Sequence, residues 1–140
     1  MTSVHLRIIL RWLLAAVYVT FGILHLQIAP VLAPMVPHWV PQPLAMIKFT
    51  GICEILGGLG LLVAPVRPFA GVMLAIYAVC VYPANLHHAF GHVHIQGMPS
   101  SWWYHGPRLA FQPVFVWWAL FAGELIDWPL RRRAARRRPA

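Results

Sequence analysis

The chain has 140 residues, of which 60% are hydrophobic and only 10% are charged, and its mean hydropathy is +0.67. A soluble domain carries about a quarter charged residues, so this composition excludes an ordinary water-soluble fold. Residues 12–47 and 68–107 contain no Lys, Arg, Asp or Glu. Because a bilayer span needs roughly 20 apolar residues, the length allows four spans with short connections and no extramembrane domain.

The distribution of basic residues indicates membrane topology. The net charge is +8, but six of the eleven basic residues form the C-terminal blocks Arg131–Arg133 and Arg136–Arg138. A basic block beside a hydrophobic span is typical of a cytoplasmic tail that contacts anionic lipid head groups. We therefore interpret residues 131–140 as a basic tail, and we expect the lipid bilayer, not nucleic acid, as its partner.

The first two spans are separated by a segment rich in proline. The first predicted span covers about residues 8–26; Arg7 and Arg11 flank its start, and the apolar run is too long for a signal peptide. Residues 27–43 contain five prolines and cannot form one continuous helix. Because this segment is still apolar, we expect a loop that re-enters the membrane or lies along its interface. The second predicted span covers about residues 44–63.

A second pair of spans follows. The third predicted span covers about residues 69–87, and we expect Pro83 to bend its end. A loop over residues 88–106, rich in His, Gly and aromatic residues, leads to the fourth predicted span at about residues 107–128. The expected fold is an all-α membrane protein in which residues 1–130 form a single bundle of four transmembrane helices.

The basic residues near the span ends predict the orientation of this bundle. Arg7, Arg11, Arg67 and the tail fall on one side, and only Lys48 and Arg108 fall on the other. The arginine-rich side should be cytoplasmic, so both termini are expected inside the cell (inner) membrane. The Pro-rich segment and the His-rich loop would then share the outer face.

Glu54 is the only acidic residue in the first 123 positions, and it lies within the second span. A carboxylate at that depth costs about 3 kcal/mol on insertion scales. Gly51, Glu54 and Gly58 are three and four residues apart and share a helix face, so we expect Glu54 to point into the bundle. It is either a structural carboxyl bonded between helices or a functional acid that carries protons, binds a ligand or acts in catalysis. Lys48 and Arg108 are its candidate cationic partners.

Five of the eight histidines fall in one short segment; these are His87, His88, His92, His94 and His105. The spacing of the first four could chelate a divalent metal, although it matches no specific signature such as H-E-x-x-H. A structural zinc site usually recruits Cys as well, so interfacial histidines are the alternative interpretation, and a proton relay toward Glu54 is a third. On the first span, His25 forms a stripe with Tyr18 and Gly22 and is a further ligand-binding candidate.

Two amide side chains and one arginine lie near the outer ends of the last two spans. Pro83 frees a backbone carbonyl one turn earlier, and Asn85 either satisfies exposed backbone groups or presents its amide to a ligand. Arg108 and Gln112 are four residues apart and share a face. Arg108 either snorkels toward head groups or holds a specific partner such as Glu54.

Four segments carry a family resemblance: PHWVP at 37–41, TGICEILGGLGLL at 50–62, VYPANLHHAF at 81–90 and PRLAFQPVFVWWAL at 107–120. In this order, across roughly residues 8–125, the chain resembles the DoxX-like integral membrane proteins. The resemblance implies a four-helix membrane bundle. Some relatives are subunits of quinone-linked sulfur oxidoreductases, and others act as membrane partners in redox or assembly complexes. The family-like positions are Glu54, Pro83, Ala84, Asn85, Arg108 and Gln112.

The leading functional hypothesis is a non-autonomous component of a redox or assembly complex that holds a lipophilic ligand, such as a quinone, near Glu54. The ligand-binding candidates are Asn85, Arg108, Gln112, His87, His88, Lys48 and His25, and the metal-binding candidates are His87, His88, His92 and His94. One alternative is a membrane enzyme that uses Glu54 as an acid/base and needs a cavity beside it. A second is a transporter or metal-handling protein that uses the His-rich loop. A membrane or periplasmic redox protein and a second copy of the chain are the expected protein partners.

Overall fold

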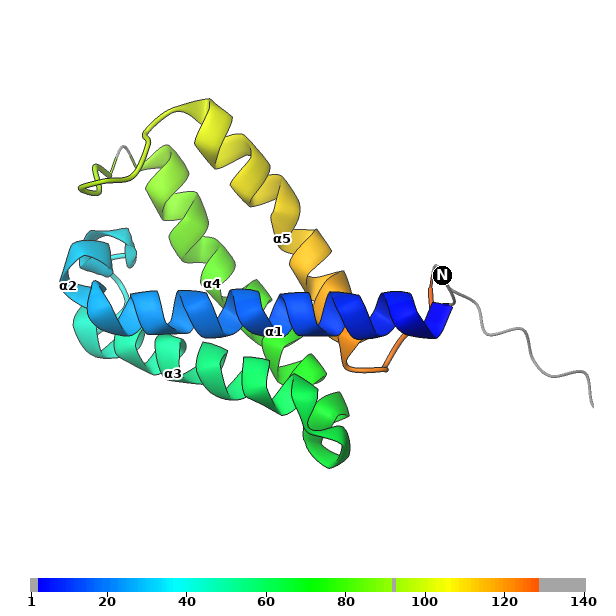
Figure 1. Ribbon diagram of the computed structural model, residues 1–140. Coiled ribbons are helices and arrows are strands. Elements are labelled where there is room, and N and C mark those ends of the chain that lie inside the picture. Colours follow the sequence, from blue (N-terminus) through cyan, green and yellow to red (C-terminus); the bar gives the residue numbers. More distant parts are fainter. Residues whose placement is uncertain (1–2, 92, 129–140) are drawn as a thin grey trace, which may run out of the picture.

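The computed structural model describes residues 3–91 and 93–128, shown in Figure 1. Its elements are α1 (Ser3–Gln27), α2 (Ala29–Leu32), the 3-10 turn η1 (Ala33–Met35), α3 (Pro43–Leu62), the 3-10 turn η2 (Ala64–Val66), α4 (Arg67–Phe90) and α5 (Trp102–Ala122). The described part of the chain contains helices and no strands, which confirms the all-α class. The basic tail predicted at residues 131–140 lies outside the described residues, and so does His92.

Proline positions explain where several helices begin. The prolines between α1 and α3 restrict the chain to the short α2 and η1, so the prediction that residues 27–43 form no continuous helix is confirmed. α3 begins at Pro43, and Pro68 lies in the first turn of α4. The N–H groups in the first turn of a helix have no partner within the helix, so proline loses no helical hydrogen bond at these positions.

The predicted boundaries of the last two spans need correction. α4 continues through Pro83 to Phe90, and α5 already begins at Trp102, so the loop predicted over residues 88–106 is much shorter. α5 also tolerates two internal prolines. It ends at Ala122, before the predicted end at residue 128, because Glu124 adopts a left-handed backbone with φ of 66° that no helix can continue.

Three helical stretches in the described residues are long and apolar enough to cross a membrane: Val4–Gln27, Pro43–Leu62 and Ala64–Phe90. Many large apolar side chains are exposed on them, including Trp12, Phe49 and Val79, as expected when lipid replaces water. α5 is not among the three stretches. It contains an arginine, a glutamine and two internal prolines, which lower its hydropathy. A fourth crossing by α5 therefore stays a prediction.

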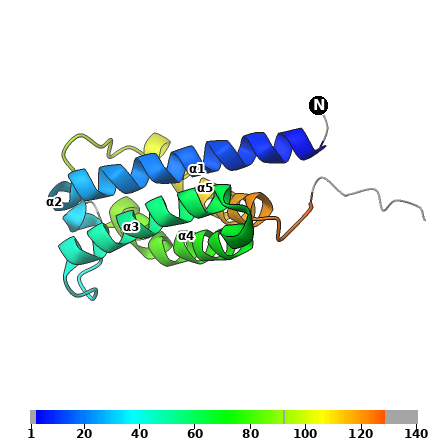
Figure 2. The ribbon, with the colours of Figure 1, turned by 60° about the horizontal axis from the view of Figure 1, so that its bottom comes forward.

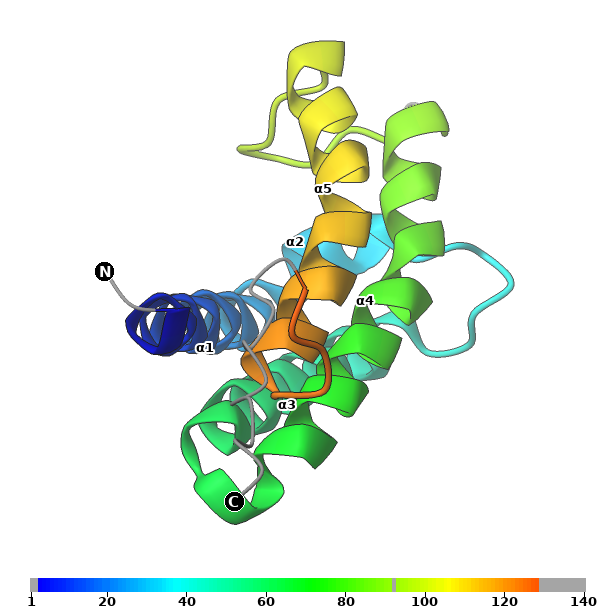
Figure 3. The same ribbon diagram turned by 90° about the vertical axis from the view of Figure 1, so that its right-hand side faces the viewer.

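The four long helices alternate in direction. α1, α3 and α4 lie side by side in Figure 2, and α4 and α5 run together in Figure 3. The start of α1, the start of α4 and the segment after α5 meet at one end through ion pairs. Arg7 lies 2.6 Å from Asp127, whereas Arg11 and Arg67 lie 2.6 and 3.1 Å from Glu124. The prediction that these three arginines share one end of the molecule is confirmed.

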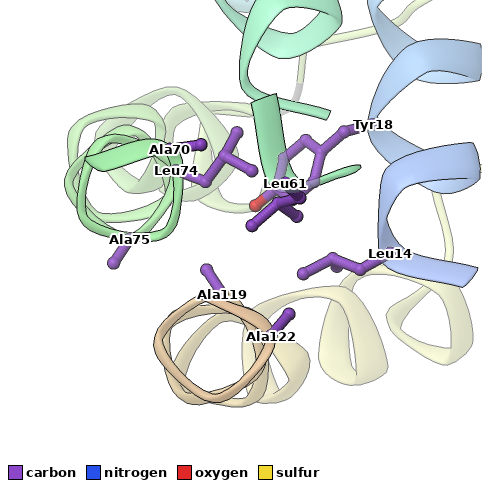
Figure 4. Close-up of a cluster of buried hydrophobic side chains, with 8 residues drawn as sticks. All are labelled: Leu14, Tyr18, Leu61, Ala70, Leu74, Ala75, Ala119 and Ala122. Carbon is purple, nitrogen blue, oxygen red and sulfur yellow. The ribbon is translucent and has the colours of Figure 1, made fainter. Parts of the chain in front are cut away.

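The main core lies where these four helices cross. Figure 4 shows its members: Leu14, Tyr18, Leu61, Ala70, Leu74, Ala75, Ala119 and Ala122. Half of them are alanines, which allow the helix backbones to approach closely, as is typical of packing in membranes. Gly71 and Gly123 extend this close packing, since a Cβ on Gly71 would lie 2.8 Å from the Cα of Gly123.

A second apolar cluster lies at the opposite end from the arginines. Its buried members are Ala29, Leu32, Met35, Ile47 and Ile95. They join the Pro-rich segment to the His-rich loop, and a ring nitrogen of His87 lies 3.1 Å from the carbonyl oxygen of Met35. The prediction that the two connections share one end of the bundle is therefore confirmed.

Candidate functional site

Glu54 forms the centre of the candidate site. It is 4% exposed, on the buried face of α3 with Gly51 and Gly58, and its Oε2 contacts Nδ1 of His25 on α1. The expectation that Glu54 points into the bundle is confirmed. The pair flanks a close helix crossing, because a Cβ on Gly22 would lie 2.6 Å from the carbonyl oxygen of Gly51. Glycine at both positions lets α1 and α3 approach until imidazole and carboxyl meet.

The predicted cationic partners of Glu54 are wrong. Lys48 is exposed, Arg108 bonds to His88, and neither pairs with Glu54 in the described structure. Lys48 and Arg108 carry full positive charges, whereas the partner in the structure is an imidazole on another helix. The stripe that His25 forms with Gly22 was the available signal in the sequence.

Tyr77 of α4 completes the surroundings of this pair. Its side chain lies near Glu54 and Thr50, and its ring packs edge-on against Tyr18 with 6.1 Å between centroids. Carboxyl, imidazole and phenol groups can each donate or accept a proton, and here they come from three different helices. Tyr77 could not be identified from the sequence, because an uncharged aromatic residue within a span resembles any other packing residue.

Glu54 lines neither of two hollows that lie near the outer end. A groove of about 310 Å³ on the surface of α3 is lined by Pro41, Gln42, Ala45, Met46 and Phe49. A cavity of about 140 Å³ is lined by His88, Ala89, Val93, His94, Ser100 and His105.

Asn85 and Gln112 form a second buried polar group, between α4 and α5. Asn85 Nδ2 donates to Gln112 Oε1 at 3.1 Å, and Gln112 Nε2 donates to the backbone oxygen of Ala78. Pro83 lacks the N–H that would bond to the carbonyl of Val79, so the helical hydrogen bonding of α4 is interrupted next to Ala78. Asn85 thus orients the amide of Gln112, which donates to the backbone oxygen of Ala78. Neither amide contacts Glu54, so the predicted single site is divided into two groups.

Arg108 and His88 form a third polar contact, beside the second. Arg108 Nη1 lies 2.9 Å from Nδ1 of His88 and its guanidinium lies over the ring of Tyr104 at 5.7 Å. A guanidinium only donates hydrogen bonds, so Nδ1 of His88 accepts, and a neutral His88 carries its proton on Nε2. Tyr77 lies within electrostatic range of both Arg108 and Glu54.

The histidines predicted as metal ligands were His87, His88, His92 and His94. His87 contacts a backbone oxygen of η1, and Nδ1 of His88 is occupied by Arg108. Across residues 3–91 and 93–128, no three His, Cys, Asp or Glu side chains are grouped so that they could hold a metal ion. His92 lies outside these residues, so the four-histidine hypothesis as a whole stays a prediction.

The arginine end joins three segments through ion pairs and hydrogen bonds. Arg11, which is 7% exposed, donates to Glu124 and to the backbone oxygen of Ala122, the latter at 2.9 Å. Partial burial raises the pKa of Glu124, but the hydrogen bond from Arg11 and the charges of Arg11, Arg67 and Arg7 outweigh it. The net result is a pKa below the usual value. These contacts tie α1, α4 and the end of α5 together.

The family described as Domain of unknown function (DUF8561) matches residues 14–123, so the chain belongs to that family. The match includes the Glu54–His25 pair, the amide pair and the Arg108–His88 contact. No curated protein and no solved structure matches the chain.

Proposed function

We propose that this member of the DUF8561 family is a non-autonomous component of a redox or assembly complex in the cell (inner) membrane. It holds a lipophilic ligand with a hydrogen-bonding head group, a quinone by chemical class. The observation that carries this proposal is the buried Glu54–His25 pair with Tyr77 beside it. Protonatable groups inside an apolar bundle are costly, and membrane proteins retain them mainly where they bind ligands or move protons.

The chemistry of the pair suits a quinone. Quinone carbonyl oxygens accept hydrogen bonds and take up protons on reduction, and Glu54, His25 and Tyr77 can supply both. The side chain of His25 is 27% exposed, against 6% for that of Glu54, so a ligand reaches the pair through the imidazole. The resemblance to DoxX-like proteins, some of which belong to quinone-linked enzymes, supports the same class.

A partner protein would supply the electrons. The cysteines, Cys53 and Cys80, are both free, and the sequence contains no CxxC pair. The outer end, where the Pro-rich segment packs against the His-rich loop, is the surface on which such a partner would dock near His25. This arrangement supports a component of a complex over an autonomous oxidoreductase.

The proposed topology has four crossings with both termini in the cytoplasm. The arginine end, with Arg7, Arg11 and Arg67, would be cytoplasmic by the positive-inside rule. Trp39 and Trp103 are 68% and 91% exposed at the other end, as expected at an outer interface. α5 packs along α4, which supports it as the fourth crossing.

Titration with a short-chain quinone, followed by quenching of tryptophan fluorescence, tests this function on the purified full-length protein. Glu54→Gln should weaken binding about 10- to 100-fold, because a hydrogen bond to a charged group contributes about 1.5–3 kcal/mol. Asp127→Asn, which neutralises a carboxylate at the arginine end, is the matched control and should bind like the wild type. No quinone binding by wild type, or equal affinity in Glu54→Gln, would refute the proposal.

A further inference from the structure

The cavity of about 140 Å³ is a separate polar site at the outer end of the bundle. It lies between the end of α4, the His-rich loop and the first turn of α5, and three of its six lining residues are histidines. It shares no residue with the Glu54–His25 pair. The proposed quinone site therefore leaves this cavity without a function.

One of the residues that line this cavity has a ring nitrogen without a hydrogen-bond partner. His105 is 4% exposed, and its Nδ1 is the one fully buried side-chain nitrogen or oxygen without a hydrogen bond among the described residues. An unpaired buried polar atom costs about 1–3 kcal/mol, so it is rare in a native fold unless a ligand or water pairs with it. Because Nδ1 itself has almost no accessible surface, His105 meets an occupant of the cavity through the rest of its ring.

The neighbouring groups define the charge of that occupant. His88 packs edge-to-face against His105 with 4.7 Å between ring centroids, and Arg108 donates to its Nδ1. The Nε2 of a neutral His88 therefore carries a proton, and the charge of Arg108 makes that N–H a stronger donor. A metal ion needs a nitrogen lone pair at this position, so the tautomer and the nearby guanidinium both disfavour a cation.

No acidic group opposes this positive environment. Glu54 is the only acidic residue before position 124, and it is engaged with His25. Ser100 adds a hydroxyl donor to the wall, and His94 adds an exposed imidazole. The cavity thus presents hydrogen-bond donors and a net positive field to an occupant that accepts hydrogen bonds.

We propose that this cavity binds a phosphate-type oxyanion, supplied either by the head group of a membrane phospholipid or as free inorganic phosphate. Its volume exceeds the roughly 30 Å³ of one water molecule and is well below the roughly 300 Å³ at which pockets for drug-sized ligands begin. Trp102 and Trp103, which are 58% and 91% exposed beside it, are typical of head-group depth in a bilayer.

Phosphate binding to the delipidated full-length protein, measured by calorimetry, tests the free-anion source. Native mass spectrometry after reconstitution with phosphatidylglycerol tests the lipid source. His105→Phe removes both ring nitrogens from the cavity wall and keeps an aromatic ring, and Ser100→Ala removes only an exposed hydroxyl. His38→Phe, at an exposed histidine of the Pro-rich segment outside the cavity, is the matched control.

Phosphate affinity that falls at least tenfold in His105→Phe, but not in His38→Phe, would identify free phosphate. Phosphatidylglycerol retained by wild type and lost in His105→Phe, without phosphate binding, would identify a lipid head group. If His105→Phe does not fold, the same comparison is made with Ser100→Ala. Equal binding of both probes by wild type and the cavity variants would overturn the proposal, and so would stoichiometric Zn²⁺ binding lost in His105→Phe. None of these outcomes changes the quinone binding expected at Glu54.

Discussion

Gly22 of α1 and Gly51 of α3 lie in backbone contact, and this contact holds His25 beside Glu54. A Cβ on Gly51 would lie 2.8 Å from the carbonyl oxygen of Gly22 and 3.0 Å from the Cβ of His25. In lipid, helices gain little from the hydrophobic effect and associate through close packing and polar contacts. The glycine crossing therefore determines both the stability of the α1–α3 pair and the geometry of the candidate site.

Replacing Gly51 with alanine should separate α1 from α3. The added methyl group meets backbone and cannot be accommodated by a side-chain rotation, so we expect a loss of about 1–3 kcal/mol in the free energy of unfolding. Quinone binding should weaken at the same time, because His25 moves away from Glu54. Denaturant unfolding in detergent micelles measures the first effect.

Gly106→Ala is the control for this substitution. Gly106 also lies within a helix, but a Cβ there would meet no atom within 4 Å. Alanine should therefore leave stability unchanged or raise it by about 0.5–1 kcal/mol, since glycine disfavours a helix. Equal unfolding free energies for Gly51→Ala and Gly106→Ala would contradict the close contact between α1 and α3 at Gly51.

The amide pair between α4 and α5 should show a measurable coupling energy. Asn85 holds Gln112, which in turn bonds to the carbonyl of Ala78, and either single leucine substitution removes the hydrogen bond between the two amides. A double-mutant cycle of Asn85→Leu and Gln112→Leu should give about 0.6 kcal/mol, which is typical of hydrogen bonds between membrane helices. Strictly additive losses in unfolding free energy would show that the two side chains act independently.

Glu124→Gln should destabilise the arginine end. It leaves Arg11, which is almost fully buried, without its carboxylate partner. Breaking a fully buried pair costs about 3–5 kcal/mol, but the Glu124 side chain is 41% exposed, so solvent screening reduces the expected loss to about 1–2 kcal/mol. Asp127→Asn, at a more exposed pair, should cost less. A larger loss of unfolding free energy in Asp127→Asn than in Glu124→Gln would show that the Arg7–Asp127 pair, and not the Arg11–Glu124 pair, is the stronger contact at this end.

Acid should weaken the same end of the bundle. The pKa of Glu124 in the folded protein lies below the usual 4.5, so its contribution to stability is present above that value and is lost as the pH falls through the folded-state pKa. Unfolding free energy of the wild type should therefore fall on acidification below about pH 4.5. In Glu124→Gln this part of the pH dependence should disappear. Identical pH profiles for the two proteins would contradict the role of this carboxylate.

Composition and small-residue spacing were sufficient to predict the helical class, the arginine end and the inward face of Glu54. Each of these features depends on the positions of charged and apolar residues along the chain, and these positions can be read from a single sequence. The helix ends were less predictable. α5 accommodates two prolines, whereas Glu124 adopts a left-handed backbone just after its end, held by Arg11 and Arg67 from distant parts of the chain.

The partners of the polar side chains could not be predicted from the sequence, because they depend on the register between helices. Arg108 was expected near Glu54 on grounds of charge, yet it binds His88 on the neighbouring helix. Nothing in the sequence singled out Tyr77, although it lies within electrostatic range of both Glu54 and Arg108. Such contacts depend on where helices cross, and that is fixed by glycine contacts such as Gly22–Gly51.

Mass spectrometry of the small molecules that co-purify with the protein is the most direct test of a lipophilic ligand at Glu54. Wild type, Glu54→Gln and Asp127→Asn should be purified in parallel from the same membranes in a mild detergent. We predict a quinone or a comparable lipophile bound to wild type and Asp127→Asn and strongly depleted in Glu54→Gln. The same molecules in equal amounts on all three proteins would contradict a ligand site and leave Glu54 as a structural carboxyl between α1, α3 and α4.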